Sequence, residues 1–175
     1  DALGISDQTY VVFTTDNGGR GTVPGGDPKS PAPNVPLSGA KHSLLEGGIR
    51  VPLMVRGPTI KAASVCRVPL AGYDFLPTFH ELAGGKGNLS KELDGGSFVT
   101  LFSDPEIDSV KRPIDGLVFS RPRQRMAVIR SEQWKLLAEV NAKREIQSAR
   151  LFNVVDDIAE EHDLSTKQAD KAKQL

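Results

Sequence analysis

The sequence predicts an α/β portion in the first part of the chain and a smaller α+β portion after it. Residues 10–15 (YVVFTT) form a continuous run of apolar and β-branched side chains, typical of a strand buried on both faces. Residues 73–83 carry the apolar spacing of an amphipathic helix. Short strand candidates separated by polar turns follow and indicate an antiparallel meander. We therefore predict two domains, residues 1–105 and residues 106–175.

The composition is that of an ordinary globular protein and narrows the function classes. The chain has 22 Lys plus Arg and 22 Asp plus Glu, so its charge gives no indication of nucleic-acid binding. No apolar run approaches the roughly 20 residues that a membrane helix needs. Cys66 is the only cysteine, which excludes an internal disulfide and a cysteine-based metal cluster.

The first residues predict that this chain lacks an N-terminal portion. The sequence begins DALGISDQ, in which residues 1–3 look like the last turn of a helix closed by Gly4. A natural domain rarely begins in the last turn of a helix. We therefore expect the preceding part of the fold to be removed or supplied by another chain.

Glycine and proline divide the first domain into elements. Half of residues 18–39 are Gly or Pro, which predicts a long irregular loop. Gly47 and Gly48 are expected to end a short helical turn, and Asp74 is a plausible N-cap of the amphipathic helix. The expected turn, second strand and helix cover residues 41–46, 51–56 and 73–83.

The second domain is predicted to be built mainly from short strands. They are expected over residues 117–120, 125–130, 133–139 and 151–154. Residues 159–175 are polar and lean towards a helix. Four carboxylates are predicted to cluster at the N-terminus of that helix, stabilised by its macrodipole, and not to form a metal site: Asp156, Asp157, Glu160 and Glu161.

Asp16 and Asn17 come directly after the first predicted strand and admit two interpretations. A carboxylate beside an amide oxygen offers two ligands for a hard cation such as Ca²⁺, and the glycines that follow allow close approach of a ligand. Asp-Asn-Gly is also favourable turn chemistry. On this stretch alone, the turn is the favoured interpretation.

The stretch GAKHSLLEGGIR, residues 39–50, contains the next candidate residues. Lys41 could project an ammonium group into a cleft and pair with an anionic oxygen, and His42 could donate a hydrogen bond. Without further context, a solvated lysine and a loop histidine are favoured. Glu46 and Arg50 are four residues apart, and a structural ion pair is favoured over catalysis for both.

No residue in the chain stands out as a catalytic nucleophile. The sequence has no G-x-S-x-G elbow, no Walker-type loop and no histidine triad pattern. If the protein is an enzyme, we expect that this chain does not contain all of the catalytic residues.

Taken together and in order, the motifs resemble the C-terminal half of the type I sulfatases. The stretches that carry the resemblance are TYVVFTTDNGG, PLSGAKHSLLEGGIRVPLMVRGP, GYDFLPTFHELAGG and LDGGSF. The final part, MAVIRSEQWKLL and RLFNVVDDIAEEHDL, is similar to the small C-terminal subdomain of that family. The resemblance covers essentially the whole chain, and four linked motifs are far more specific than any one of them.

The resemblance implies a fold, an activity and three site residues. Sulfatases have an alkaline-phosphatase-like α/β sandwich and hydrolyse sulfate esters, so this chain is expected to form part of that sandwich and a small antiparallel α+β subdomain. Asp16 and Asn17 match ligands of the active-site cation, usually Ca²⁺ and otherwise another divalent ion. Lys41 matches the lysine that contacts the sulfate group. No catalytic role passes to His42, because many members have glycine at that place.

The family's nucleophile has no counterpart here. It is a formylglycine made from Cys or Ser in a C/S-x-P/A-x-R motif, which these 175 residues lack. We expect it in the missing N-terminal portion and expect the isolated chain to be inactive or nearly so.

Two other functions stay open at this point. One is hydrolysis of phosphate or phosphonate esters by the same type of fold, and the other is a truncated, non-catalytic Ca²⁺-binding or interaction module. The resemblance implies a sulfated small molecule or glycan as substrate, and family members are often periplasmic, secreted or lysosomal. A complementary N-terminal chain or a homo-oligomer is expected to cover an exposed sheet.

Overall fold

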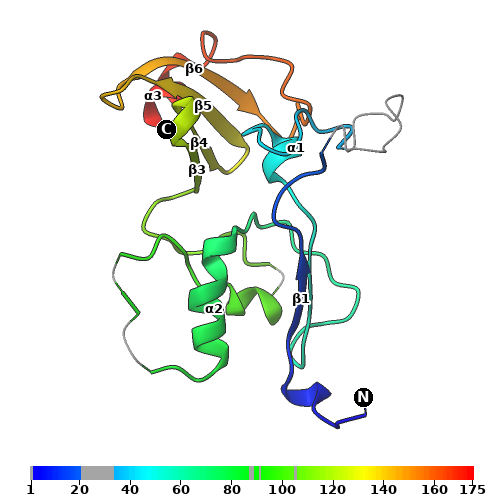
Figure 1. Ribbon diagram of the computed structural model, residues 1–175. Helices are drawn as coiled ribbons and strands as arrows, with labels where there is room; N and C mark the ends of the chain where they lie inside the picture. Colours follow the sequence, from blue (N-terminus) through cyan, green and yellow to red (C-terminus); the bar gives the residue numbers. More distant parts are fainter. Residues whose placement is uncertain (1, 21–33, 87–88, 91, 105) are drawn as a thin grey trace. The chain divides into compact units, whose positions relative to one another are not determined.

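The chain folds into two compact units, each built from two separate segments. The computed structural model describes residues 2–20, 34–86, 89–90, 92–104 and 106–175. The first unit comprises Asp1–Phe13 and Met54–Leu117, and the second comprises Thr14–Leu53 and Val118–Leu175 (Figure 1). These units group the residues differently from a single cut after residue 105. None of the helices in the described part of the chain has the length and hydrophobicity that a membrane crossing needs.

The second unit contains a four-stranded sheet that confirms the predicted meander. The strands lie in the order β3-β4-β5-β6 and are β3 Leu117–Arg121, β4 Met126–Ser131, β5 Trp134–Val140 and β6 Ile146–Asn153. β4 and β5 pair antiparallel from Met126↔Glu139 to Ser131↔Trp134. β5 and β6 also pair antiparallel, with an irregularity at Glu139/Val140. β6 begins five residues before the strand that the sequence predicts.

The hydrophobic core of the second unit joins this sheet to the segment that precedes α1 (Glu46–Ile49). Leu44 from that segment packs with side chains from the strands and from the residue after β6. These partners are Val128, Leu137, Phe152 and Val154. Burial of a side chain of this kind stabilises a fold by about 1.5–3 kcal/mol. The core therefore anchors residues near the candidate site to the sheet.

The C-terminal part of the second unit corrects one prediction. Residues 154–168 form turns and irregular backbone, and the only helix described after them is α3, Ala169–Gln174. Asp157 accepts hydrogen bonds from the amides of Glu161 and His162 (3.1 and 2.8 Å). Burial raises the pKa of Asp157, but these hydrogen bonds outweigh burial and leave the pKa below its usual value.

Glu160 shows why the predicted helix N-terminal cluster is wrong. Its backbone has φ of +55°, which does not continue a right-handed helix, and its side chain is buried in the second unit. A buried carboxylate needs a partner within the protein, and Glu160 finds one on a distant strand.

The first unit combines a two-stranded sheet with one amphipathic helix. Its elements are η1 Ser6–Gln8, β1 Val11–Thr14, β2 Leu53–Arg56, η2 Gly72–Asp74, α2 Phe75–Leu82 and η3 Val99–Phe102. β1, β2 and α2 confirm the predicted strands and helix, and Val99–Phe102 form the short 3₁₀ helix η3. β1 is not buried on both faces, however, because Val11 and Phe13 are half exposed in this chain.

Asp74 is the polar centre of the first unit. It occupies the N-cap position of α2, as predicted, yet its carboxylate does not cap that helix. It accepts hydrogen bonds from the amides of Ala71 (2.8 Å) and Gly96 (3.0 Å) and from Nε and Nη2 of Arg112 (2.9 and 2.8 Å). Asp74 and Arg112 therefore form a buried ion pair in which both carboxylate oxygens accept hydrogen bonds.

Removing the negative charge at Asp74 is expected to destabilise the first unit. In Asp74→Asn the buried guanidinium of Arg112 loses its counter-ion, and breaking a buried pair in this way costs about 3–5 kcal/mol. Native-state hydrogen exchange of the α2 amides measures this loss. The exposed Asp115→Asn variant is the control, with an expected change within about 0.5 kcal/mol. Equal protection in both variants would contradict the prediction.

Candidate functional site

Asp16 and Asn17 form the turn that follows β1. Asp16 is exposed and Asn17 is half-buried. The Thr15 hydroxyl donates a hydrogen bond to the Asn17 carbonyl (3.2 Å), which holds the turn. The next amide, Gly18 N–H, donates to the Gly48 carbonyl (3.0 Å) and ties the turn to α1. The chain therefore bends at Asp16 and Asn17 directly after β1, and cation binding by their side chains stays a prediction.

Asn34 joins the turn to the segment that carries Lys41. Its Oδ1 accepts from Gly19 N–H (2.8 Å), and its Nδ2 donates to the carbonyls of Gly19 (3.0 Å) and Gly39 (3.1 Å). The Lys41 amide also donates to the Gly19 carbonyl (3.0 Å). Asp16, Asn17 and Lys41 thus lie on two segments that five hydrogen bonds, including that of Gly18, hold together. The sequence analysis did not identify Asn34.

Glycines make this contact possible. A Cβ added to Gly18 would collide with the Gly47 carbonyl, and one added to Gly47 or Gly48 would collide with the carbonyl of Gly39 or Ser43. The colliding atoms belong to the backbone, so no side-chain rotation can relieve the clash. The helical turn predicted over residues 41–46 is also corrected. α1 begins at Glu46 and includes Gly47 and Gly48, both of which are buried.

The candidate site is open to solvent. Lys41 and His42 are exposed, and His42 adopts a left-handed backbone with φ of +75°. This backbone conformation favours glycine over other residues. Most of the loop predicted over residues 18–39 lies outside the described residues.

Asp16 and Asn17 fit one part of a cation site. Their carboxylate and amide oxygens are the donors that Ca²⁺ prefers, but Ca²⁺ takes six to eight oxygen ligands in proteins. Among the described residues, no three His, Cys, Asp or Glu side chains lie close enough together to hold a metal ion. Further ligands would have to come from other groups, and the roles of Asp16, Asn17 and Lys41 stay predictions.

A cluster of buried charged side chains surrounds Glu46, the first residue of α1. Lys135 Nζ on β5 is 3.0 Å from Glu46 Oε1 and 2.8 Å from Glu160 Oε1. Arg50 Nη1 lies 3.7 Å from Glu46 Oε2, which confirms the predicted i,i+4 pair. Sequence reasoning missed Lys135 and assigned Glu160 to a helix N-terminal cluster instead. The only local signal is a lysine within the otherwise apolar stretch of WKLLA.

Arg130 on β4 belongs to the surroundings of this cluster. Burial lowers the pKa of the Arg130 guanidinium, Glu46 raises it and Arg50 lowers it further. Its Nε is buried without a hydrogen-bond partner among the described residues. Glu46 therefore lies in the field of three cationic side chains.

Comparison with known proteins relates the chain to one family. The family model described as Sulfatase matches residues 1–85. A protein named "Sulfatase" from Formosa agariphila is 34% identical over 107 residues, which cover 59% of this chain and 18% of that relative. The solved structure of Ps i-CgsB in complex with k-i-k-neocarrahexaose is 33% identical, with a TM-score of 0.73. It matches 97% of this chain but only 35% of its own length.

A solved phosphonate monoester hydrolase of Agrobacterium radiobacter is more distantly similar. It is 19% identical with a TM-score of 0.59, and the match covers 99% of this chain and 34% of that one. At this identity the likeness concerns the fold alone. The chain spans about a third of either solved protein, so much of each solved fold lies outside the part that this chain matches.

A side chain at Gly18 is expected to disrupt the candidate site. In Gly18→Ala the new Cβ meets the Gly47 carbonyl, and overpacking of this kind costs about 1–3 kcal/mol. Thermal unfolding followed by fluorescence of Trp134, the only tryptophan, reports on the second unit. In the control Gly72→Ala, the added Cβ has no atom within 4 Å. An unfolding midpoint in Gly18→Ala as high as in this control would contradict the packing described above.

Proposed function

Because a sulfatase-type domain covers part of the chain, we propose that the protein takes part in the hydrolysis of sulfate esters of a small molecule or a glycan. Its α/β fold is that of the alkaline-phosphatase-like sulfatases, as the sequence predicts. The observation that carries the proposal is the hydrogen-bonded junction of Asp16–Gly19 with the Lys41 segment. This junction brings cation-type oxygens and an ammonium group to neighbouring backbone segments.

Each of the three predicted residues has a chemical task in this proposal. The Asp16 carboxylate and the Asn17 amide oxygen hold part of the coordination sphere of Ca²⁺ or another divalent cation. Such a cation, when bound, supplies positive charge that polarises a sulfate oxygen. The exposed Lys41 ammonium pairs with a further sulfate oxygen and stabilises the negative charge that grows there during hydrolysis.

The nucleophile of this reaction is assigned to residues outside the chain. The 175 residues lack the C/S-x-P/A-x-R motif from which a formylglycine is made. We therefore assign that residue to a part of the sulfatase-type domain that these residues do not include. Without it, the chain holds a charge-stabilising lysine and a partial cation site but no group to attack sulfur.

Hydrolysis of phosphate or phosphonate esters is the second candidate. The phosphonate monoester hydrolase shares the fold alone, and this candidate rests on the chemistry of the esters, since both classes present similar tetrahedral, oxygen-rich groups to a cation and a lysine. The two candidates are separated by the ester that is turned over.

The activity proposal predicts no turnover for the chain alone and turnover when the fold is completed. The 175-residue chain is assayed with a chromogenic aryl sulfate and the matching aryl phosphate. It is then assayed as a chimaera in which it replaces the matched segment of Ps i-CgsB, with k-i-k-neocarrahexaose as an additional substrate. We expect sulfate release by the chimaera only, and a loss of about 100- to 1,000-fold in kcat/KM in its Lys41→Ala and Asp16→Ala variants.

Controls separate loss of chemistry from loss of folding. Lys61→Ala changes an exposed lysine of the first unit and is expected to leave kcat/KM unchanged in the chimaera. Circular dichroism verifies that each chimaera is folded. Aryl sulfate turnover by the isolated chain at the rate of an ordinary sulfatase would refute the assignment of the nucleophile. Full activity of the Lys41→Ala chimaera would refute the role of the lysine, and preference for the aryl phosphate would select the second candidate.

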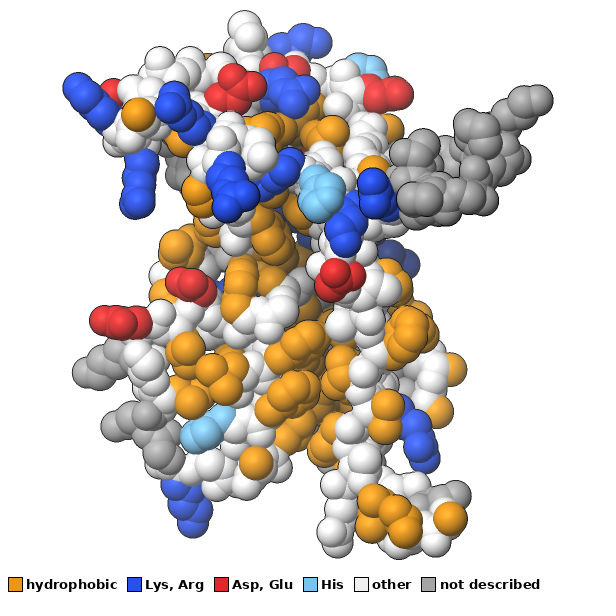
Figure 2. Space-filling view, viewed as in Figure 1, with side chains coloured by type: hydrophobic (Ala, Val, Ile, Leu, Met, Phe, Trp, Pro, Cys, Tyr) orange, Lys and Arg blue, Asp and Glu red, His pale blue; other side chains and the backbone are white. Residues whose placement is uncertain are grey.

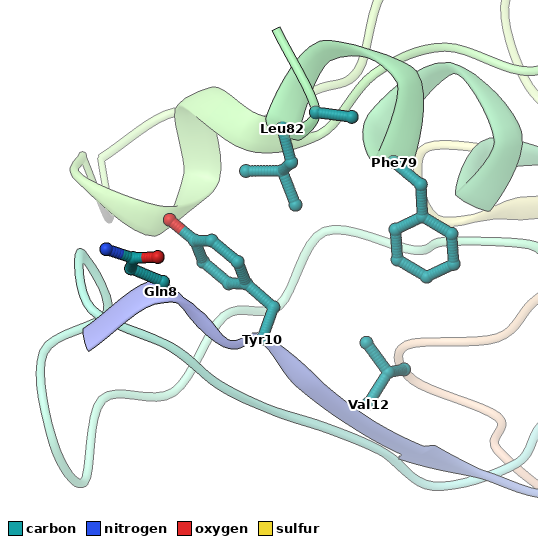
Figure 3. Close-up of a pocket in the computed structure, with 6 residues that line it drawn as sticks. Gln8, Tyr10, Val12, Phe79 and Leu82 are labelled. Atoms are coloured by element: carbon teal, nitrogen blue, oxygen red, sulfur yellow. The ribbon is translucent and has the colours of Figure 1, made fainter. Parts of the chain in front are cut away.

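The first unit leaves apolar side chains uncovered, which concerns its partners. Exposed hydrophobic residues lie on β1, β2 and α2, and Figure 2 shows hydrophobic side chains gathered over this unit. They are Val11, Phe13, Met54, Leu76 and Phe79, exposed by 44–58%. An open groove of about 410 Å³ lies between β1 and α2, where Tyr10 and Val12 face Phe79 and Leu82 (Figure 3).

We propose that a polypeptide segment from the remainder of a sulfatase-type domain covers the side of β1 that carries Val11 and Phe13, which is opposite to the groove. Support comes from the length of Ps i-CgsB, of which this chain matches only 35%. Exposed patches of this kind normally mark an interaction surface. A complementary chain and a second copy of this chain are the two partners that the sequence predicts.

The docking proposal predicts a monomer with an accessible apolar surface. Sedimentation of the isolated chain at rising concentration, with fluorescence of a hydrophobic dye, tests it. We expect a monomer that binds the dye, and weaker dye binding in Val11→Thr/Phe13→Thr. Concentration-dependent dimers that this double variant abolishes would overturn the proposal in favour of a second copy. A monomer that binds no dye would overturn the docking surface itself.

A further inference from the structure

The buried cluster around Lys135 links the sheet of the second unit to α1. Lys135 and Glu160 are fully buried, and Glu46 is 1% exposed. Lys135 Nζ lies between the two carboxylates, at 3.0 Å from Glu46 and 2.8 Å from Glu160. The three residues are far apart in the sequence, so the cluster connects three separate segments of the chain.

Glu160 closes the cluster with a second contact. Its Oε2 accepts a hydrogen bond from the backbone amide of Glu46 (2.6 Å). That amide is the first of α1, and the first amides of a helix have no acceptor within the helix. Glu160 therefore restrains the backbone at the start of α1, while Lys135 restrains the side chain of the same residue.

Stability alone is a poor reason for this arrangement. Two carboxylates and one ammonium leave a net negative charge in a buried place, compensated by Arg50 at 3.7 Å and by the nearby Arg130. Taking such charges out of water costs several kcal/mol for each ion, roughly as much as their attraction returns. Two of these contacts are directional hydrogen bonds, from Lys135 Nζ to Glu46 Oε1 and from the Glu46 amide to Glu160 Oε2, whereas Glu160 Oε1 meets Lys135 only as an ion pair.

The position that is held belongs to the candidate site. Directly after Glu46, the Gly47 amide donates to the Ser38 carbonyl (2.7 Å), and the Gly48 carbonyl accepts from Gly18 N–H (3.0 Å). Ser38 leads into the segment of Lys41, and Gly18 follows Asn17. A shift of α1 would therefore move both segments that carry the proposed sulfate-binding and cation-binding groups.

We propose that Lys135 is a positioning residue for the candidate site. Through Glu46 and Glu160 it holds α1 at the place where Gly47 and Gly48 align the Asp16–Asn17 turn with the Lys41 segment. Its significance for sulfate esters rests on the proposed function. The effect of Lys135 on the backbone of α1 does not depend on the proposed function, and it can be measured without substrate or metal.

Hydrogen exchange of individual amides in the 175-residue chain tests this role. Two variants are compared with the native chain, Lys135→Met and the neutral triple variant Lys135→Met/Glu46→Gln/Glu160→Gln. The triple variant removes the charges of Lys135, Glu46 and Glu160 together, so that only Arg130 and Arg50 lose the Glu46 carboxylate, and it provides the test if the single variant unfolds. Lys143→Met, an exposed lysine in the turn between β5 and β6, is the control.

The expected result is selective loosening near the candidate site. The amides of Gly18, Lys41 and Gly47 should exchange about tenfold faster or more in the triple variant, while those of the β4–β5 ladder keep their protection. The control should match the native chain. Unchanged exchange at the three site amides, or an equal increase at every amide, would overturn the proposal. Selective loosening combined with an inactive chimaera would retain the positioning role and reject the proposed function.

Discussion

The contact between Gly18 and the Gly47–Gly48 backbone is the constraint on which the candidate site depends. Here two chain segments meet without side chains between them, and the hydrogen bond from Gly18 to Gly48 runs directly across the junction. The positions of the candidate residues follow from this close contact between the two backbones. The turn that carries Asp16 and Asn17 has its position because Gly18 lies against α1, and Lys41 has its position because its amide bonds to Gly19.

Two kinds of interaction hold α1 in place and thereby support this junction. Leu44 contributes apolar burial against the sheet, which is strong but has no preferred direction. The ionic contacts of Glu46 are directional, but the free energy needed to remove these charges from water offsets much of their attraction. The combination explains how a helix of only four residues keeps a defined place, since helices this short do not persist by themselves.

The elements that the sequence predicts are those with a local signal. The amphipathic spacing of residues 73–83 and the short strand candidates between polar turns are contained in a few neighbouring residues, and the structure confirms both. The resemblance to the sulfatases also predicted the α/β fold. The contacts of Lys135 and Glu160 escaped prediction because their partners are distant in sequence, 114 residues apart in the case of Glu46 and Glu160. The exposure of β1 was not predicted, because a sequence shows how apolar a strand is but not which part of the protein covers it.

The amide of Asn34 has a consequence for how this region can vary. With its bonds to Gly19 and Gly39, it ties together the two ends of the stretch between residues 19 and 34. Closing a loop costs free energy that grows only slowly with its length. Insertions, deletions and new side chains can therefore accumulate between these ends while the turn and the lysine segment keep their alignment.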